Sequence, residues 1–187
     1  MNAYDFDHTI YRGDASFDFI LFTLRRHPGL IRYLPADAVA IFLYVVKAWN
    51  RKQIKQVAFS FLKSLKDVDQ ELDLFWKAHE HKLEDWYLTQ KQSTDVIISA
   101  SPEFLLRPIT TQLGVETLIA TRMDKTTGKI DGENCRAGEK IIRLKQIIPE
   151  PSFEKAYSDS LSDTPLLKLA KEAFIVHKGE MSAFNAN

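Results

Sequence analysis

The chain has few of the residues that mark specialised classes of protein. Its 187 residues include one cysteine, Cys135, seven glycines and seven prolines. A single cysteine excludes an internal disulfide framework and a zinc site built from cysteines. The low glycine and proline content excludes a low-complexity or collagen-like chain. With 45% hydrophobic and 27% charged residues, the composition is instead that of an ordinary globular protein.

An overall excess of charge of one sign is also missing. Lys and Arg together number 25, as do Asp and Glu, so no net charge draws the chain toward nucleic acid. The charge is unevenly distributed, however, because residues 20–66 hold nine basic side chains and one acid, Asp37, a net charge of +8. This asymmetry predicts two regions with different partners. The basic region is either a solvated helical face or a surface that attracts anions.

Long apolar runs are absent as well. The most apolar run covers residues 38–46, less than half of the roughly 20 residues that a membrane span needs. It therefore predicts a buried or interfacial helix. The first residues contain neither the basic region nor the apolar core of a signal peptide, so we expect a cytoplasmic protein. The five histidines show no spacing typical of a zinc site.

The hydrophobic pattern predicts a short strand over residues 3–6, followed by a long helical block. Phe17, Ile20, Leu21 and Leu24 recur at the i, i+3, i+4, i+7 spacing of a helix. Further helices are predicted over residues 35–49, 51–66 and 69–88. No strand signal occurs within the block.

Strands and helices alternate after this block. Strands are predicted over residues 95–99, 115–121, 155–158 and 173–176, and helices over residues 102–113, 138–148 and 164–172. A turn at residues 126–129 precedes residues 130–134, the expected far arm of a small hairpin. Such alternation predicts an α/β fold, a parallel sheet with helices on both faces. We expect a core domain from residues 1–15 and 88–187, and an inserted helical cap from residues 16–87.

Polar side chains gather at the ends of three predicted strands. The three groups are Asp5, Asp7 and Thr9; Ser99 and Ser101; and Ser158, Asp159 and Asp163. Because ligands bind beyond the carboxyl ends of parallel strands, these groups are expected to meet in one crevice. Asp5 and Asp7 share one side of an extended chain, and their repulsion calls for a cation or a shared proton. A few carboxylates beside a substrate phosphate form a typical Mg²⁺ site.

A phosphate would also need positive charge and hydrogen-bond donors. Lys140 can supply the charge, although a lysine in a helix is more often solvated surface. Ser99 and Thr9 can donate hydroxyl hydrogen bonds.

The ordered motifs resemble those of haloacid dehalogenase superfamily phosphatases. The segment Asp5-Phe6-Asp7-His8-Thr9 resembles the DxDxT motif that opens this family's fold. Ser99, Lys140 and the pair Asp159 and Asp163 resemble the second, third and fourth motifs, in the family's order. The resemblance covers essentially the whole chain. It implies a Rossmann-like core, with a parallel sheet between helices, and an inserted C1-type helical cap.

The helical insertion and the stretch 128–140 resemble the phosphoserine phosphatase-like branch, subfamily IB. Residues 157–160 and 163–167 are similar to less characterised members of this branch, which include phosphatidylglycerophosphatase C. Phosphoserine phosphatases usually have glycine where this chain has Ser158 and Ser160. That departure weakens the assignment to phosphoserine but leaves the implied metal site intact.

The resemblance implies a role for each motif residue. Asp5 is the nucleophile that forms an aspartyl-phosphate, and Asp7 is the general acid and base. Asp5, the backbone carbonyl of Asp7 and Asp159 hold Mg²⁺, and Asp163 supports Lys140 or a metal-bound water. Residues that bind the phosphoryl group are Thr9, Ser99 and Lys140. The reaction is hydrolysis of a phosphomonoester, with a phosphotransferase or mutase, or a non-catalytic binding protein on the same fold, as alternatives.

The cap is expected to select the substrate, a small phosphorylated metabolite such as phosphoserine or the head-group phosphate of a phospholipid. Asp14 either binds a substrate amine or caps a helix. Arg51 is a candidate partner for a substrate carboxylate, as are Arg25 and Arg32. Alternatively, the basic and apolar segment 20–66 contacts an anionic membrane surface, or it is a plain structural cap.

Overall fold

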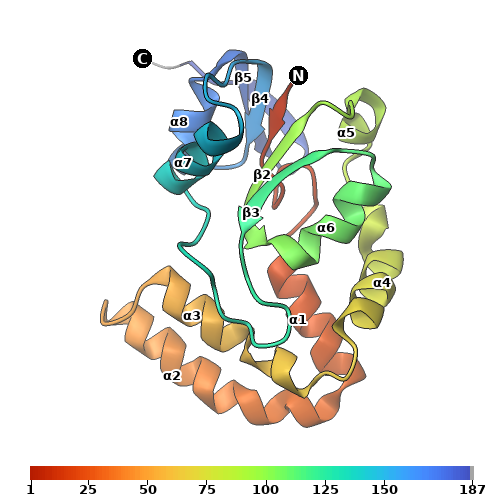
Figure 1. Cartoon of the computed structure of the whole chain (residues 1–187), viewed down its shortest axis with the longest axis vertical. Helices are drawn as coiled ribbons and strands as arrows, with labels where there is room; N and C mark the ends of the chain where they lie inside the picture. Colours follow the sequence, from red (N-terminus) through yellow and green to blue (C-terminus); the bar gives the residue numbers. More distant parts are fainter. Residues whose placement is uncertain (186–187) are drawn as a thin grey trace.

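A six-stranded sheet lies at the centre of the structure, a computed structural model that describes residues 1–185 (Figure 1). Its strands run in the order β3-β2-β1-β4-β5-β6, and only β6 is antiparallel to its neighbour. The strands are β1 (Ala3–Tyr4), β2 (Val96–Pro102), β3 (Thr117–Thr121), β4 (Phe153–Ser158), β5 (Ala170–His177) and β6 (Glu180–Ala183). The predicted α/β class is confirmed.

Helices cover both faces of this sheet. Helices α4 (Val68–His79), α5 (Asp85–Gln90) and α6 (Glu103–Gln112) lie on one side, and α7 (Gly138–Ile147) and α8 (Thr164–Leu167) on the other (Figure 1). Successive strand residues point to opposite faces: Tyr4 packs into the apolar cluster with α4 and α6, whereas Ala3 packs with Leu144 and Leu166. The inner strands are apolar on both sides because both faces are buried.

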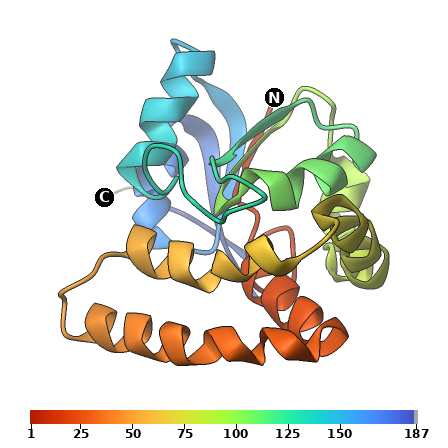
Figure 2. The same ribbon diagram turned by 60° about the horizontal axis from the view of Figure 1, so that its bottom comes forward.

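The helical block after β1 consists of α1 (Ala15–Arg26), a 3-10 turn (Pro28–Tyr33), α2 (Leu34–Val45), α3 (Arg51–Ala58) and a second 3-10 turn (Ser60–Ser64). Asp14 caps α1 by accepting a hydrogen bond from the Phe17 amide at 2.9 Å. Asn50 and Gln53 form a reciprocal capping box at the start of α3. Figure 2 shows α2 and α3 side by side beneath the sheet, with α2 on the outer side.

Several predicted elements differ from those observed. The helix predicted over residues 51–66 ends at Ala58, and the one predicted over residues 69–88 is divided into α4 and α5 by a 3-10 turn (Glu80–Lys82). The predicted hairpin is reduced to one antiparallel bridge between Met123 and Ile130. The helix predicted over residues 164–172 is wrong beyond Leu167, because Ala170 already pairs with Phe153 in the sheet.

The boundary between core and cap stays a prediction. Within the predicted cap, Phe75 and Trp76 of α4 belong to the same apolar cluster as Tyr4 and Leu105. The Trp76 Nε1 atom also donates a 2.7 Å hydrogen bond to the Leu105 carbonyl of α6. The α2–α3 hairpin is therefore the part of residues 16–87 that stands farthest from the sheet (Figure 2).

Candidate active site

A cavity of about 440 Å³ opens at the carboxyl ends of β1, β2 and β4. Two aspartates that follow β1, Asp5 and Asp7, line it from the sheet side. From the α2–α3 hairpin the lining residues include Tyr44, Arg51 and Lys55. Of the strand-end residues predicted from the sequence, Asp5, Asp7, Asp159 and Asp163 meet on this cavity, which is bounded on its other side by the inserted helices.

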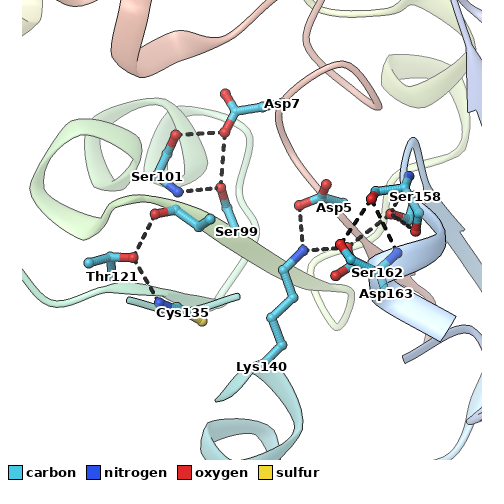
Figure 3. Close-up of polar contacts among 12 residues, drawn as sticks. Asp5, Asp7, Ser99, Ser101, Thr121, Cys135, Lys140, Ser158, Ser162 and Asp163 are labelled. Atoms are coloured by element: carbon cyan, nitrogen blue, oxygen red, sulfur yellow. Dashed lines mark hydrogen bonds and ion pairs between the residues drawn. The ribbon is translucent and has the colours of Figure 1, made fainter. Parts of the chain in front are cut away.

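The turn after β1 orients the two aspartates. The amides of Ile10 and Tyr11 both donate to the Phe6 carbonyl, at 3.1 and 3.0 Å, which folds the chain back on itself. His8 has a left-handed φ of 57°, a conformation that polar residues tolerate in tight turns, and its amide donates to the Gly13 carbonyl. This path carries Asp7 away from Asp5, so that the two carboxylates have different partners although they line one cavity (Figure 3).

Lys140, on the first turn of α7, bridges two carboxylates. Its Nζ atom lies 2.8 Å from Asp5 Oδ1 and 2.5 Å from Asp163 Oδ2 (Figure 3). Asp163 also accepts a 2.9 Å hydrogen bond from the Ser158 hydroxyl. All four residues are buried, and Lys140 is only 2% exposed. A buried cation fixed between two acids holds the Asp5 carboxylate in one orientation at the end of β1.

Burial and neighbouring charges shift the pKa values of Asp5 and Lys140. Burial raises the pKa of Asp5 to about 7, although contact with Lys140 acts in the opposite direction. Burial alone would lower the pKa of Lys140, but the carboxylates of Asp5 and Asp163 raise it above its ordinary value. Lys140 is therefore a permanent positive charge beside Asp5.

Asp7 has a separate set of hydrogen bonds. Its Oδ2 atom accepts from the hydroxyls of Ser101 at 2.6 Å and Ser99 at 3.2 Å (Figure 3). Its Oδ1 atom accepts from the Ala15 amide at 2.7 Å. Burial and the nearby charge of Asp14 raise the pKa of Asp7 to about 6, while the Ser101 hydrogen bond lowers it. Three donors thus fix the Asp7 carboxylate where it faces the cavity.

Two residues predicted to bind phosphate lie behind the cavity wall. Ser99 is fully buried, and its hydroxyl joins Asp7 to the Ser101 amide. Thr9 is 1% exposed, and its Oγ1 atom has no hydrogen-bond partner among residues 1–185. Neither residue lines the cavity. Ala100, which lies between Ser99 and Ser101, lines it instead. Phosphate binding by Thr9 and Ser99 stays a prediction.

The donor set suits a hard divalent cation. Asp159 is exposed and lines the same cavity as Asp5, and carboxylate and carbonyl oxygens are the ligands that Mg²⁺ prefers. Over residues 1–185, however, no group of three or more His, Cys, Asp or Glu side chains forms a metal-binding cluster. A cation held by Asp5, Asp159 and the Asp7 backbone carbonyl would use only two side chains, so the residues present fit the predicted site.

Two candidate specificity residues also face the cavity. The Asp14 side chain caps α1, and it lines the cavity as well, so both predicted roles are compatible with its position. Arg51, the first residue of α3, lines the cavity with its guanidinium carbon 5.6 Å from the centre of the Tyr44 ring. Its position leaves the guanidinium available to an anionic substrate group.

Sequence reasoning did not identify Lys55, one helical turn beyond Arg51 on α3. Its Nζ atom donates to the Ala100 carbonyl at 2.7 Å and to Asn134 Oδ1 at 3.2 Å. Burial lowers the pKa of Lys55, although the negative charges of Asp7 and Asp14 act in the opposite direction. Lys55 thus ties the cap to the segment between Ser99 and Ser101. Its i, i+4 spacing from Arg51 was the available signal, since it places both cations on one helix face.

Comparisons with known proteins agree with this geometry. The sequence profile of the haloacid dehalogenase-like hydrolases matches residues 3–168. Protein CicA of Caulobacter vibrioides is 31% identical over 190 residues, which cover 91% of this chain and 82% of that protein. A Bordetella pertussis protein of unknown function has a similar structure, with a TM-score of 0.74 and 19% identity over 92% of this chain and 87% of that one.

A substrate-bound phosphoserine phosphatase has the same fold, with a TM-score of 0.59 and 16% identity over 92% of this chain and 83% of that chain. This likeness shows the shared fold, and the family profile extends from the first predicted motif past the last. The expectation drawn from the motifs is therefore confirmed: the chain belongs to the haloacid dehalogenase-like hydrolase family.

Proposed function

We propose that this protein is a Mg²⁺-dependent phosphatase that hydrolyses phosphomonoesters through an aspartyl-phosphate on Asp5. The observation that carries the proposal is the buried contact of Lys140 with Asp5 and Asp163, next to a second carboxylate, Asp7, on the same cavity. A binding protein would need neither a nucleophile fixed by a buried cation nor a second acid held by three donors.

The residues divide the reaction between them. An Asp5 oxygen attacks phosphorus, the bond to the leaving alkoxide breaks, and Asp7 donates a proton to that alkoxide. Asp7 then accepts a proton from the water that hydrolyses the aspartyl-phosphate, which returns both carboxylates to their starting state. Lys140 balances negative charge on the phosphoryl oxygens and orients Asp5. Bound Mg²⁺, held by Asp5, Asp159 and the Asp7 carbonyl, would supply further charge neutralisation.

The cavity lining supports two classes of substrate. A small amino-acid phosphate such as phosphoserine would place its amine near Asp14 and its carboxylate near Arg51, both of which line the cavity. A phospholipid head group would also bind Arg51, and the rest of the lipid would extend past the apolar lining at Phe17 and Ile20. Both substrates present a phosphomonoester and a second charged group. We place the enzyme in the cytoplasm, where either substrate could reach it.

The experiment that tests this function is a panel of phosphomonoesters with Mg²⁺, including phosphoserine and phosphatidylglycerophosphate. Wild-type protein should release phosphate from at least one ester, and Asp5→Asn should not. Asp73→Asn is a matched control because Asp73 is exposed on α4. Loss of phosphoserine turnover in Asp14→Ala would support the amino-acid class, because a site built for a charged group loses far more than contact area when its partner is removed.

Added alcohols distinguish hydrolysis from phosphoryl transfer. A phosphotransferase would pass the phosphoryl group mainly to the alcohol, whereas the proposed hydrolase releases mainly inorganic phosphate. No turnover of any ester by folded, Mg²⁺-supplied protein would favour the non-catalytic alternative and contradict the proposal.

A further inference from the structure

The outer surface of α2 is apolar and exposed. Eight residues of α2 and its C-cap lie on the outward side: Leu34, Pro35, Ala38, Val39, Ile41, Phe42, Val45 and Val46. At about 100° per residue they cover an arc of roughly 160° that contains no polar side chain. Phe42 and Val45 are 63% and 69% exposed. We call these eight residues the α2 face.

The most buried residues of α2 lie on its inner side. Ala40 is its one buried residue, and Tyr33, Asp37 and Tyr44, on the same side, are half-buried. The segment Pro28–Val45 is long and apolar enough to cross a membrane by composition, yet only 11% of its residues are buried. An apolar helix face normally packs against a partner. The α2 face therefore has the character of a surface that is covered by something else.

Basic residues stand at both ends of the α2 face. Arg25 and Arg32 precede it, and Lys47 follows it, all three of them exposed. None of these three forms an ion pair with any residue that the structure describes, and Arg32 donates a hydrogen bond to the Ser64 hydroxyl. Trp49, half-buried in the turn after α2, is a residue type enriched where protein meets the membrane interface.

We propose that the α2 face docks on an anionic lipid bilayer, with α2 lying in the plane of the interface. Apolar side chains enter the acyl boundary while the flanking cations meet lipid phosphates, as in interfacial helices. The alternative occupant, a second copy paired through the same face, would bring the like-charged flanks of two copies together. Figure 2 shows α2 as the outermost element on this side, with α3 between it and the sheet, so a flat surface can reach it.

This docking is separate from catalysis, and its test separates the two. Co-sedimentation is measured with vesicles of phosphatidylcholine, with and without phosphatidylglycerol, at low and high salt. Wild-type protein should pellet with the anionic vesicles. Less of it should pellet at high salt, because the Debye length, over which charges interact, falls to about 3 Å at 1 M. Phe42→Ser/Val45→Ser should weaken partitioning at least about tenfold, since two large apolar side chains no longer leave water.

The matched control is Ile142→Ser/Ile147→Ser on α7, whose side chains are 57% and 56% exposed. This variant should bind vesicles as the wild type does. Asp5→Asn should also bind normally, so an inactive enzyme and a failed docking surface give different results.

Three results would overturn docking on a bilayer, and a fourth would overturn its preference for anionic lipid. One is absence of vesicle binding at low salt, and another is equal binding by the α2 variant and the α7 control. The third is a stable dimer in solution that Phe42→Ser/Val45→Ser dissociates, since the α2 face would then be covered by a second copy. Equal binding to vesicles without phosphatidylglycerol would refute the role assigned to the cations.

Discussion

Removal of the Lys140 charge is expected to destabilise the protein in a way that depends on pH. Lys140→Met leaves the buried carboxylates of Asp5 and Asp163 without the cation that now lies 2.8 and 2.5 Å from them. Breaking a buried ion pair by removing one partner costs about 3–5 kcal/mol. We expect a loss of this size at pH 8, measured by urea unfolding in excess chelator so that no divalent cation replaces the lysine.

The pH dependence follows from Asp5. In the wild type, burial raises the pKa of Asp5 to about 7, so folded protein takes up a proton as the pH falls through 7 and its stability rises there. In Lys140→Met the folded pKa is higher still, and proton uptake continues throughout the range from pH 8 to pH 6. One pKa unit corresponds to about 1.36 kcal/mol. The difference in free energy of unfolding between the wild type and the variant should therefore narrow by about 1.4 kcal/mol as the pH falls from 8 to 6.

The matched control is Lys145→Met, which removes an exposed lysine from the same helix. It should change the free energy of unfolding by no more than about 0.5 kcal/mol. The reasoning would be refuted if Lys140→Met were as stable as this control at pH 8, or if its deficit grew as the pH fell.

Other predictions concern single residues and the metal. Asp5→Asn should lose turnover by far more than tenfold in a steady-state assay while the protein stays folded, as measured by circular dichroism, because Lys140 keeps its contact with Asp163. Chelation should abolish phosphate release and added Mg²⁺ should restore it; full activity in protein shown to be metal-free would contradict the proposed site. Lys55→Met should lower kcat/KM about tenfold, because the cap loses its bonds to Ala100 and Asn134; unchanged kinetics would show that this contact is dispensable. Contacts with Arg26 and His27 lower the pKa of Glu71 against the effect of its burial. Glu71→Gln should therefore lower the free energy of unfolding by about 1 kcal/mol at pH 7. The difference from the wild type should vanish as acid protonates Glu71 in the wild type, and a difference that stays constant down to acidic pH would contradict this.

The parallel sheet could be predicted because its inner strands are short apolar runs, followed directly by polar residues. The same reasoning failed near the end of the chain, since Pro165, Leu166 and Leu167 open a helical pattern that residues 168–172 continue in sequence. In the structure Ala170 and Glu172 pair with Phe153 and Lys155 of β4. Pairing across the sheet overrides local helix preference, and no sequence window contains that information.

The predicted site residues were found through motif order, whereas their partners were not. A lysine on an amphipathic helix is read as solvated surface, so the contact of the half-buried Lys55 with the Ala100 carbonyl emerges only when the cap is placed on the sheet. In the same way, the sequence showed that residues 38–46 are apolar but not that Phe42 and Val45 remain exposed. Burial depends on which elements meet in space, and local periodicity does not determine it.

The central claim is that Asp5 becomes phosphorylated during turnover. Protein is mixed with Mg²⁺ and a phosphomonoester that it hydrolyses, quenched in acid to preserve an acyl phosphate, and analysed by peptide mass spectrometry. The account predicts one added phosphoryl group on the peptide that contains Asp5, lost after brief exposure to hydroxylamine and absent from Asp5→Asn. Rapid turnover with no such adduct, or an adduct on a different residue, would contradict it.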